Sequence, residues 1–527
     1  MEAAQPALWL SMWPTVYRVL RALVGLPPLL LVLALCWYHW KFRRVLDAAR
    51  KLPTEVRTLP LLGHAHYVLY GSTEMVMTIV NAAKSSLAKG SKTLCLWLGP
   101  YPVVFVQRNE DVHTVLTSSK TSEKSNEYNF LRFALGNGLL IAPGHIHRIT
   151  RRYVNPMFQP RNLEKLISVF NESGQYLVQK LSSRVGKGQF DVLPMVTSTS
   201  LRSVSCTLFG PDIKIDTESE EFRGLSWAVN MVALVELNRF FKIWLWPEPV
   251  FRLLWNKEIN DIQDCWRKFA KGPLEELERK RNSQNKEIDT NENVLQDKKD
   301  SSSPLNLPDT YRTLRENHPE FQEKELHDEL LTLVVTGVDS TKSAISSCLL
   351  SLAALPEIQE LLYEEVVSVV GAGDSEVTME DLNRMPYLDM IMKETLRKYS
   401  IIPIILRTVK EDLVLSDCTL PAGATVSASF YSLHHDPEVF PDPEKFDPER
   451  FSPENMAKLK KYSYTPFSSG SRNCIGKTYA YMLTKIAVIH VIRRYKLSTD
   501  FDIRKMRYSM ALALVSDDGY PLKLEGR

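Results

Sequence analysis

The stretch 467–476, FSSGSRNCIG, constrains this chain more than any other because it holds one cysteine in a short loop between two glycines. Arg472 lies two residues before Cys474, and an apolar stretch of helical pattern, residues 479–492, follows. Glycines let the backbone approach a ligand closely, and an arginine can bind a carboxylate. A helix N-terminus lowers the pKa of a nearby thiol. The stretch predicts a thiolate facing a flat, anionic cofactor, and a buried structural cysteine is the alternative.

Five positions of this stretch match the haem-binding signature of the cytochrome P450 family, and the chain therefore resembles that family. These positions are Phe467, Gly470, Arg472, Cys474 and Gly476. The resemblance implies that haem b is the cofactor, that Cys474 is the axial ligand of its iron, and that Arg472, Phe467 and Gly476 contact the haem. A thiolate ligand favours O–O cleavage at haem iron. The C-terminal third is most similar to the microsomal group that contains the fatty-acid omega-hydroxylases.

The resemblance runs from about residue 52 to the C-terminus and implies a fold class that is mainly α with small β-sheets (α+β). We expect a membrane anchor over 1–44, a proline-containing connector over 45–63 and a catalytic domain over 64–527, with a polar surface insertion at about 282–304. A net charge of +3 gives no reason to expect nucleic acid as a partner. Seven scattered cysteines without a CxxC pair indicate a reducing compartment, with neither a disulfide framework nor a zinc site.

Residues 22–40 form a run of 19 residues without a charged side chain. A helix of that length covers about 28 Å, which is enough for the apolar core of a bilayer. Trp37, Tyr38 and Trp40 form an aromatic belt at one end, and a basic cluster follows it. This pattern predicts a single N-terminal transmembrane helix with the catalytic domain in the cytosol, and the resemblance implies the endoplasmic reticulum membrane.

Other segments carry local signals. Residues 93–98 and 101–107 predict a β-hairpin around Gly99-Pro100, and residues 325–352 predict one long helix. Residues 238–255 are rich in aromatic side chains, which either fill a core or dip into a membrane; we favour the membrane. Residues 282–304 are polar and predict a mobile surface loop. His434-His435-Asp436 has no third ligand at a suitable spacing, so we interpret it as a loop feature.

Three basic positions are expected at the haem carboxylates. His147 and Arg151 are four residues apart, which places both on one face of a helix. The family has tryptophan at the position of His147 and arginine at the position of Arg151, and both donate to a haem propionate. The resemblance assigns Arg407, in the segment IIPIILR, to a propionate as well. A solvent-exposed basic helix face is the alternative interpretation of His147.

The predicted long helix contains the chemistry expected above the haem. Gly337 and Asp339 match the family pattern, Ser340 replaces the usual threonine, and Thr341 follows. The resemblance implies that Gly337 makes room for dioxygen and that Asp339, Ser340 and Thr341 relay protons. Thr336 lies where the omega-hydroxylase group often has a glutamate that esterifies the haem, so we expect non-covalent haem. A helix bent by hydroxyl groups bonded to its own backbone is the alternative.

Glu394 and Arg397 form an E-x-x-R pair on a predicted helix, and Arg450 lies in a Pro-Glu-Arg-Phe motif further along the chain. Alone, the pair would be an ordinary surface ion pair. Because both motifs match the family in order, we expect a buried, structural ionic network of Glu394, Arg397 and Arg450.

The resulting hypothesis is a membrane-bound haem-thiolate monooxygenase that inserts one oxygen atom from O2 into an apolar substrate such as a fatty acid, terpenoid or xenobiotic. The expected partners are NADPH-cytochrome P450 reductase, which passes electrons from NADPH, cytochrome b5 and membrane lipid. The electron donor is expected to bind near Lys458, Lys460, Lys461, Arg148 and Arg152. Two alternatives remain open: a haem-thiolate isomerase or dehydratase that needs no external electrons, and a haem-binding protein without turnover.

Overall fold

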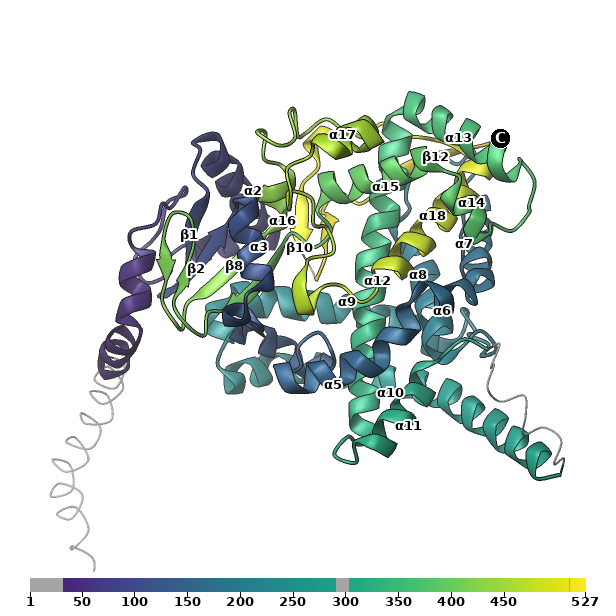
Figure 1. The fold of residues 1–527 in the computed structure, drawn as a ribbon, viewed down its shortest axis with the longest axis horizontal. Helices are drawn as coiled ribbons and strands as arrows, with labels where there is room; N and C mark the ends of the chain where they lie inside the picture. The colour runs from purple at the N-terminus through teal and green to yellow at the C-terminus, as the bar shows by residue number, and fades with distance from the viewer. Residues whose placement is uncertain (1–31, 291–302, 511) are drawn as a thin grey trace, which may run out of the picture.

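One long helix, α12, runs through the middle of the computed structural model, which describes residues 32–290, 303–510 and 512–527 (Figure 1). It spans Glu323–Ala354, so the expected helix over 325–352 is confirmed and is two residues longer at each end. A capping box starts it, in which the Glu325 carboxylate accepts the Gln322 backbone N–H at 2.8 Å. Between residues 329 and 353 every residue is buried except Thr336, Gly337 and Ser340. These three residues therefore mark the side of the helix that adjoins open space.

Helices make up most of the chain. Their bounds are α2 Ser72–Ala88, α3 Asn109–Thr117, α4 Arg132–Leu135, α5 Gly144–Val154, α6 Pro160–Glu164, α7 Ile167–Ser182, α8 Leu193–Phe209, α9 Glu220–Phe241, α10 Glu248–Thr290, α11 Leu307–Asn317, α13 Pro356–Val370, α14 Met379–Asn383, α15 Pro386–Tyr399, α16 Phe430–His434, α17 Pro453–Lys458 and α18 Lys477–Arg494. A further helix covers residues 32–49. The expectation of a mainly helical fold with small sheets is confirmed.

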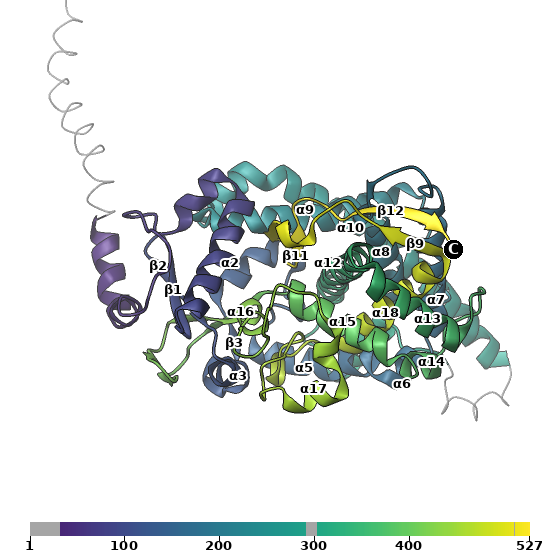
Figure 2. The ribbon, with the colours of Figure 1, turned by 90° about the horizontal axis from the view of Figure 1, so that it is seen from above.

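The largest sheet has the strand order β1-β2-β8-β5-β3 and lies on one side of α12, with α7, α8 and α18 on the other side (Figures 1 and 2). Its strands are β1 Thr93–Leu98, β2 Tyr101–Val106, β8 Thr425–Ser429, β5 Ile404–Thr408 and β3 Glu123–Lys124. The predicted hairpin is confirmed as the antiparallel pair β1–β2. Small sheets join β4 Phe190–Asp191, β12 Pro521–Gly526 and β9 Tyr495–Ser498; β6 Leu413–Val414 and β7 Thr419–Leu420; and β10 Tyr508–Met510 and β11 Leu514–Ser516.

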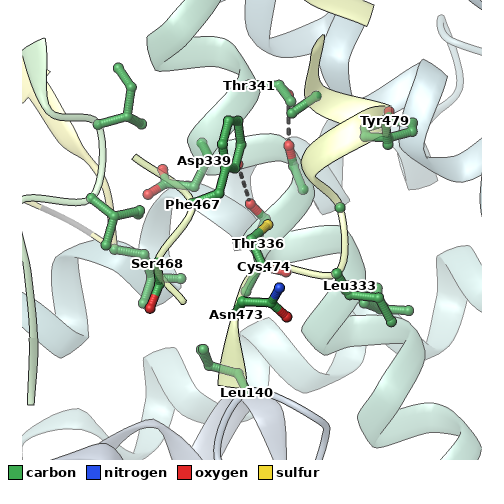
Figure 3. A pocket seen from close by; sticks show the side chains of 18 of the residues that line it. Leu140, Leu333, Thr336, Asp339, Thr341, Phe467, Ser468, Asn473, Cys474 and Tyr479 are labelled. Carbon is green, nitrogen blue, oxygen red and sulfur yellow. Dashed lines mark hydrogen bonds between the residues drawn. The ribbon is translucent and has the colours of Figure 1, made fainter. Parts of the chain in front are cut away.

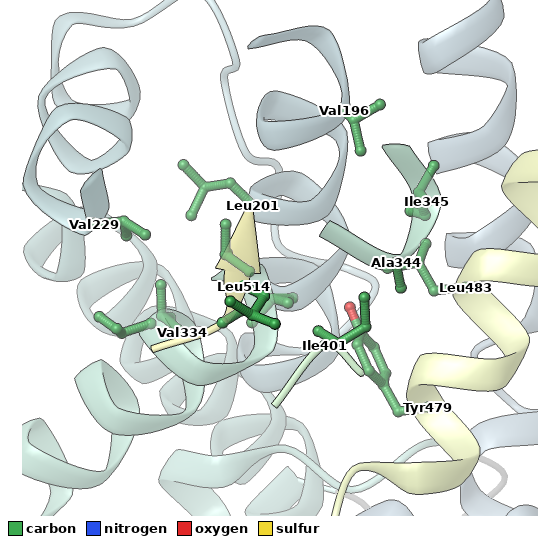
Figure 4. Close-up of a cluster of buried hydrophobic side chains, with 14 of the residues drawn as sticks. Val196, Leu201, Val229, Val334, Ala344, Ile345, Ile401, Tyr479, Leu483 and Leu514 are labelled. Carbon is green, nitrogen blue, oxygen red and sulfur yellow. The ribbon is translucent and has the colours of Figure 1, made fainter. Parts of the chain in front are cut away.

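The main hydrophobic core surrounds α12. Leu201 of α8, Val229 of α9 and Leu483 of α18 lie around Val334 and neighbouring residues of α12, all fully or almost fully buried (Figure 4). Burying an aliphatic side chain of this size contributes about 1.5–3 kcal/mol. The core therefore fixes α8 and α18, which both border the cysteine loop's cavity, relative to α12.

A buried ionic network supports the segment that leads to the cysteine loop. Arg397 donates through Nε at 2.7 Å and Nη2 at 2.9 Å to the two oxygens of Glu394, and both side chains are 0% exposed. Arg450 Nε, in the 3-10 turn Pro448–Phe451, lies 3.6 Å from Glu394 Oε1. Arg397 Nη1 also donates to the His434 carbonyl at 2.8 Å. The network thereby ties two distant turns of the chain to α15.

Two local expectations are wrong. Helix α10 is 43 residues long and continues to Thr290, so residues 282–290 are helical and not a loop; residues 291–302 of that segment lie outside the described residues. The loop interpretation of His434-His435-Asp436 is wrong only for His434, which ends helix α16 and accepts the Thr465 backbone N–H through Nε2 at 3.2 Å; His435 and Asp436 lie beyond the helix.

The aromatic segment 238–255 is divided between core and surface, so the membrane interpretation is wrong for part of it. Phe241 and Phe251 are fully buried, and Arg239 lies over the Phe251 ring at 3.9 Å. Trp244 and Leu253 are exposed, Leu253 by 83%. The division follows the inner and outer faces of the helices: Leu253 comes two positions after Phe251 in α10 and therefore lies on the opposite side of that helix.

The predicted anchor lies partly outside the described residues. From residue 32 onward, Trp37 and Trp40 are exposed on the first helix. Among the described helices, none is by itself both long and apolar enough to cross a membrane. Tyr38 Oη donates to the Pro100 carbonyl at 3.3 Å, so the helix touches the turn of the β1–β2 hairpin.

The ionic network leads to a stability prediction. Glu394→Gln keeps the shape of the side chain but leaves the charge of Arg397 buried without a full counter-charge, so the free energy of unfolding should fall by about 3–5 kcal/mol. Urea denaturation followed by circular dichroism measures this change. The matched control is Glu454→Gln, whose ion pair with Lys458 has side chains 80% and 65% exposed and should change stability by less than about 1 kcal/mol. Equal effects of the two substitutions would contradict the prediction.

Candidate functional site

The cysteine loop is positioned from outside by helix α3. The Cys474 backbone N–H donates to the Phe467 carbonyl at 3.0 Å and closes the loop before α18 begins. Gly470 has φ +76°, and a Cβ there would collide with the Leu116 carbonyl in α3. Only glycine fits both the backbone conformation and the close approach. The first glycine of the motif therefore fixes the loop against α3.

The thiol of Cys474 opens into a cavity beneath α12 (Figure 3). Burial away from bulk water raises its pKa, while the Gly476 backbone N–H, then the charges of Arg151 and Lys477, lower it. The net shift is upward, so the expectation of a lowered thiol pKa is wrong for the polypeptide by itself. The reason is that desolvation of the thiolate outweighs the helix end and the nearby cations. A coordinated metal ion would reverse this balance because it deprotonates a thiol ligand.

Two arginines present open hydrogen-bond donors near the cavity: Arg472 lines it, whereas Arg407 is not a lining residue and lies close to Lys124 and Arg472. Arg472 Nη1 donates to the Ala142 carbonyl at 3.0 Å, and Arg407 Nη1 donates to the Leu406 carbonyl at 3.1 Å. The Nη2 atoms of both are buried without a hydrogen-bond partner among the described residues. Arg472 Nη2 lies 3.5 Å from the nearest carboxylate oxygen, that of Glu123. Burial lowers the pKa of Arg472 to about 10, which leaves it charged at neutral pH.

Lys124 joins this group and was missed from the sequence. It lies directly opposite Arg407 in the β3–β5 pairing, and opposite residues of antiparallel strands share one face of the sheet. Lys124 lines the cavity, and its Nζ lies 4.3 Å from the centroid of the Tyr128 ring. Burial, followed by the charges of Arg407 and Arg472, lowers the pKa of Lys124 well below its usual value. No local motif marks this lysine; only the strand pairing brings it to the site.

Helix α5 brings His147 and Arg151 to the same cavity, as their spacing predicted. Arg151 donates to the carbonyl of Asn473 at 2.7 Å and to its Oδ1 at 2.8 Å. His147 is buried, and burial followed by the charge of Arg472 lowers its pKa to about 3. His147 is therefore neutral at pH 7 and has one N–H to donate. The exposed-face alternative is wrong for His147, although Arg148 and Arg152 of the same helix are exposed.

Above the thiol, helix α12 contributes an acid that is already paired. Asp339 Oδ1 lies 2.8 Å from Lys342 Nζ, and its Oδ2 accepts the Ala513 backbone N–H at 2.8 Å. Lys342 also donates to Asn230 Oδ1 of α9 at 3.0 Å. The role of Lys342 was not predicted, because a lysine three residues after an acid is ordinary on helix surfaces. Here the pair is buried, so Asp339 is held in one position.

The hydroxyl groups of α12 bond to the helix backbone. Ser340 Oγ donates to the Thr336 carbonyl at 2.8 Å, and Thr341 Oγ1 donates to the Gly337 carbonyl at 2.6 Å. Thr336 Oγ1 donates to the Thr332 carbonyl at 2.7 Å. A Cβ on Gly337 would approach Val204 of α8 to 3.0 Å, so this glycine also lets α8 pack closely. The residues from Thr336 to Thr341 line the cavity, apart from Val338.

The remaining walls of the cavity are apolar. Its apolar lining includes Leu139, Leu140, Val204, Leu208, Ile401, Ile402, Ile405 and Leu512. Of the isoleucines in the IIPIILR segment, Ile404 instead faces a second, smaller cavity beside α2. Strand alternation explains this difference, because Ile404 and Ile405 point to opposite faces.

These features fit haem. The thiol is exposed to the cavity, and the open Nη2 donors of Arg407 and Arg472 lie with Lys124, His147 and Arg151 as a cluster suited to carboxylates. The apolar walls suit the porphyrin ring and an apolar substrate. Gly476 and Phe467 also line the cavity, and the Phe467 ring packs on Tyr481 at a centroid distance of 5.4 Å. Glu394, Arg397 and Arg450 lie outside the cavity, as expected for a structural network.

Comparison with known proteins also supports a haem-binding site. A family model described as Cytochrome P450 matches residues 53–522. The chain is 30% identical to "Cytochrome P450 4V2" of Homo sapiens over 508 residues, which cover 94% of each protein. It is 30% identical to "Cytochrome P450 4c21" of Blattella germanica over 448 residues, 84% of this chain and 87% of that protein.

The open donors lead to a prediction about haem retention. Arg407→Leu should speed haem loss by about ten-fold or more, because a hydrogen bond to a charged group contributes about 1.5–3 kcal/mol. Transfer of haem to excess apomyoglobin, followed by absorbance, measures the rate. Arg152→Leu is the control, since Arg152 is exposed on α5. Haem loss that is unchanged by Arg407→Leu would contradict a contact between Arg407 and the haem.

Proposed function

The chain belongs to the cytochrome P450 family of haem-thiolate monooxygenases, and from this premise we propose that it hydroxylates or epoxidises an apolar substrate with electrons from NADPH. A single observation carries the proposal: one cavity brings together the Cys474 thiol, the acid and hydroxyl groups of α12, and apolar walls. Fatty acids, terpenoids and xenobiotics are the substrate classes with suitable apolar surface. NADPH-cytochrome P450 reductase supplies the electrons in this proposal.

Each group around the cavity has a separate task in the reaction. Bound haem supplies the activation of O2. Cys474 holds the iron, and Arg407, Arg472, Arg151, Lys124 and His147 hold the two carboxylates of the haem. The walls formed by Leu139, Ile401 and their neighbours exclude water and bind the apolar part of the substrate. Because Thr336 has no carboxyl group, the haem stays non-covalently bound.

Proton delivery falls to Asp339 and the hydroxyls beside it. Asp339 exchanges protons as its contact with Lys342, now 2.8 Å, opens and closes. Ser340 Oγ, which now donates to the Thr336 carbonyl, turns toward the cavity and passes a proton on. Serine lacks the β-methyl group that restricts the threonine rotamer, so this rotation is easier than in relatives with threonine. Thr341 Oγ1, which donates to the Gly337 carbonyl in the same way, is the second hydroxyl of the proposed relay.

The electron donor docks on the basic face around the cysteine loop. Lys458, Lys460 and Lys461 are exposed before the loop, and Arg148 and Arg152 are exposed on α5. Arg151 of the same helix contacts Asn473, the neighbour of Cys474. An acidic flavoprotein or cytochrome b5 would be attracted to this charge. The contact between Arg151 and Asn473 places this face next to the cysteine loop, which supports the docking site.

In this proposal the protein associates with a membrane, from which an apolar substrate reaches the cavity. Trp37 and Trp40 are exposed on the helix over 32–49, Trp40 by 68%, and Trp244 and Leu253 are exposed at the break between α9 and α10. Gly99 links the two regions, since a Cβ there would lie 3.0 Å from Ile243 Cδ1 and 3.3 Å from the Leu61 carbonyl. We place these residues against the endoplasmic reticulum membrane, with the catalytic domain in the cytosol.

The axial ligand is tested by spectroscopy. Reduced protein exposed to carbon monoxide should show the red-shifted Soret band of thiolate-ligated haem, and Cys474→His should lose this band and the monooxygenase activity. Cys418→Ser is the control because Cys418 lies outside the cavity. A thiolate-type band that survives Cys474→His would contradict the assignment.

The proton-relay role predicts a change in coupling. In Asp339→Asn, NADPH consumption should continue while product per NADPH falls by about ten-fold or more, because general acid–base groups contribute typically 10²–10⁴-fold. Parallel assays of NADPH oxidation, hydrogen peroxide and product measure this ratio, with a substrate found by screening apolar compounds. Thr197→Val should leave coupling close to wild type, because the Thr197 hydroxyl also bonds to the carbonyl four residues back but lies outside the cavity. Unchanged coupling in Asp339→Asn would remove the role from this residue.

A further inference from the structure

A glycine-containing strap, residues 135–142, crosses α12 and leads into α5. Thr332 Oγ1 donates to the Leu135 carbonyl at 3.3 Å, and the Asn137 backbone N–H donates to Asp328 Oδ2 at 2.9 Å. Cβ atoms on Gly136 and Gly138 would collide with Asp328 and Thr332, respectively. The strap therefore lies directly on the surface of α12.

Glu329 holds the next point of the strap. Its Oε2 accepts the Leu139 backbone N–H at 2.8 Å and the hydroxyl of Tyr311, from α11, at 3.3 Å. The residue is 1% exposed, and its Oε1 is buried without a hydrogen-bond partner in the part of the chain that the structure describes. Leaving a carboxyl oxygen unpaired in this way is costly for an ionised group. The sequence interpretation and the proposed reaction give this acid no role.

Beyond Leu139 the strap becomes part of the site. Leu139 and Leu140 line the cavity, and the Ala142 carbonyl accepts a hydrogen bond from Arg472 at 3.0 Å. The Gly144 backbone N–H, at the start of α5, donates to Glu123 at 3.2 Å. The strap thus connects α12 with the helix that carries His147 and Arg151. Its position sets both a cavity wall and the contacts expected at the haem edge.

We infer that Glu329 is a positioning residue, a latch whose proton decides how firmly strap 135–142 lies on α12. The protonated latch is neutral and stays buried beside Leu139 and Tyr311. When Glu329 is ionised, opening of the strap lowers the free energy of the carboxylate, because water then reaches it. Opening of the strap weakens the contacts expected at the haem edge, because the strap binds Arg472 and leads into α5. This inference goes beyond the proposed function and does not depend on the substrate.

The surroundings of Glu329 support a proton equilibrium near neutral pH. Burial raises the pKa of Glu329 to about 7, whereas the Leu139 N–H and the Tyr311 hydroxyl lower it and the charge of Asp328 raises it. Tyr311 is itself near Thr150 of α5 and feels the charge of Glu325. The carboxyl binds its proton more tightly when buried than when exposed. The closed strap is therefore most favoured at low pH, and this preference is lost as the pH rises to about 7.

Hydrogen exchange of the holoenzyme, read by mass spectrometry on peptides from 135–147, tests the latch. After correction for the intrinsic exchange rate, the opening equilibrium of the wild type should rise roughly 30-fold from about pH 5.5 to about pH 8, for a carboxyl whose pKa changes from 4.5 in water to about 7. Glu329→Gln, a neutral isostere, should keep the strap closed with little pH dependence. Glu329→Leu, which accepts no hydrogen bond, should open it at every pH.

Controls and a second measurement separate this latch from general destabilisation. Glu323→Gln, on the exposed first turn of α12, should keep the wild-type pH dependence. Asp328→Asn should move the transition to lower pH, because it removes the neighbouring charge. Haem transfer to apomyoglobin should follow the same pH dependence as strap opening in the wild type and lose it in Glu329→Gln.

Two outcomes would overturn the latch. One is unchanged pH dependence of strap opening in Glu329→Gln, and the other is a strap as open in that variant as in Glu329→Leu. The carbon monoxide spectrum of the same samples reports independently on the thiolate ligand. If the thiolate band is present while the exchange result fails, the proposed function stands and only the latch is excluded.

Discussion

The rest of the structure depends on one constraint, the free-energy cost of burying positive charge beside the cysteine loop. Arg407 and Arg472 lie in low-dielectric surroundings with donors left open, and Lys124 is close enough to have its pKa pushed down by both. An isolated buried charge raises the free energy of the folded state, and a like charge nearby raises it further. An anion with two carboxylates would offset both costs. The charges beside the cysteine loop therefore suit an anionic cofactor such as haem.

Helix α12 holds many polar groups in an apolar core, and its hydroxyls and Asp339 at the cavity are paired with backbone carbonyls or with Lys342. Its hydroxyls bond to carbonyls one turn back, and Asp339 is paired with Lys342 and the Ala513 backbone. These contacts let the helix pack against α8 and α18 while its polar groups line the cavity.

The sequence was most informative where several short motifs occur in the expected order. The loop of Cys474 and the network of Glu394 and Arg397 were found because each motif needs a fixed spacing on one element. Lys124 could not be found in this way, because its place depends on a pairing between β3 and a strand almost three hundred residues away. The upward pKa shift of the thiol was also missed, since a motif indicates nearby donors but not the depth of burial.

The end of α10 and the aromatic segment show the limits of composition. Polar residues at 282–290 indicated a loop, yet a helix that is anchored by partly buried Leu274 and Leu277 continues through them. Phe241 and Phe251 looked the same as their exposed neighbours in the sequence, but each lies on the buried face of its helix, α9 for Phe241 and α10 for Phe251. In both cases tertiary packing decided the outcome.

The two-residue strand β3 has a consequence for how this chain tolerates change. Glu123 and Lys124 are adjacent, and they face opposite sides because successive residues of a strand alternate. Glu123 already contacts Arg472 and the Gly144 N–H at the edge of the site. A shift of one residue in the pairing with β5 would therefore break these contacts and put an acid in the place of Lys124 opposite Arg407. Insertions or deletions in the loop before β3 would therefore act on the sign of the charge at this wall more than on the shape of the fold. Length variation that is neutral in most surface loops would be selected against here.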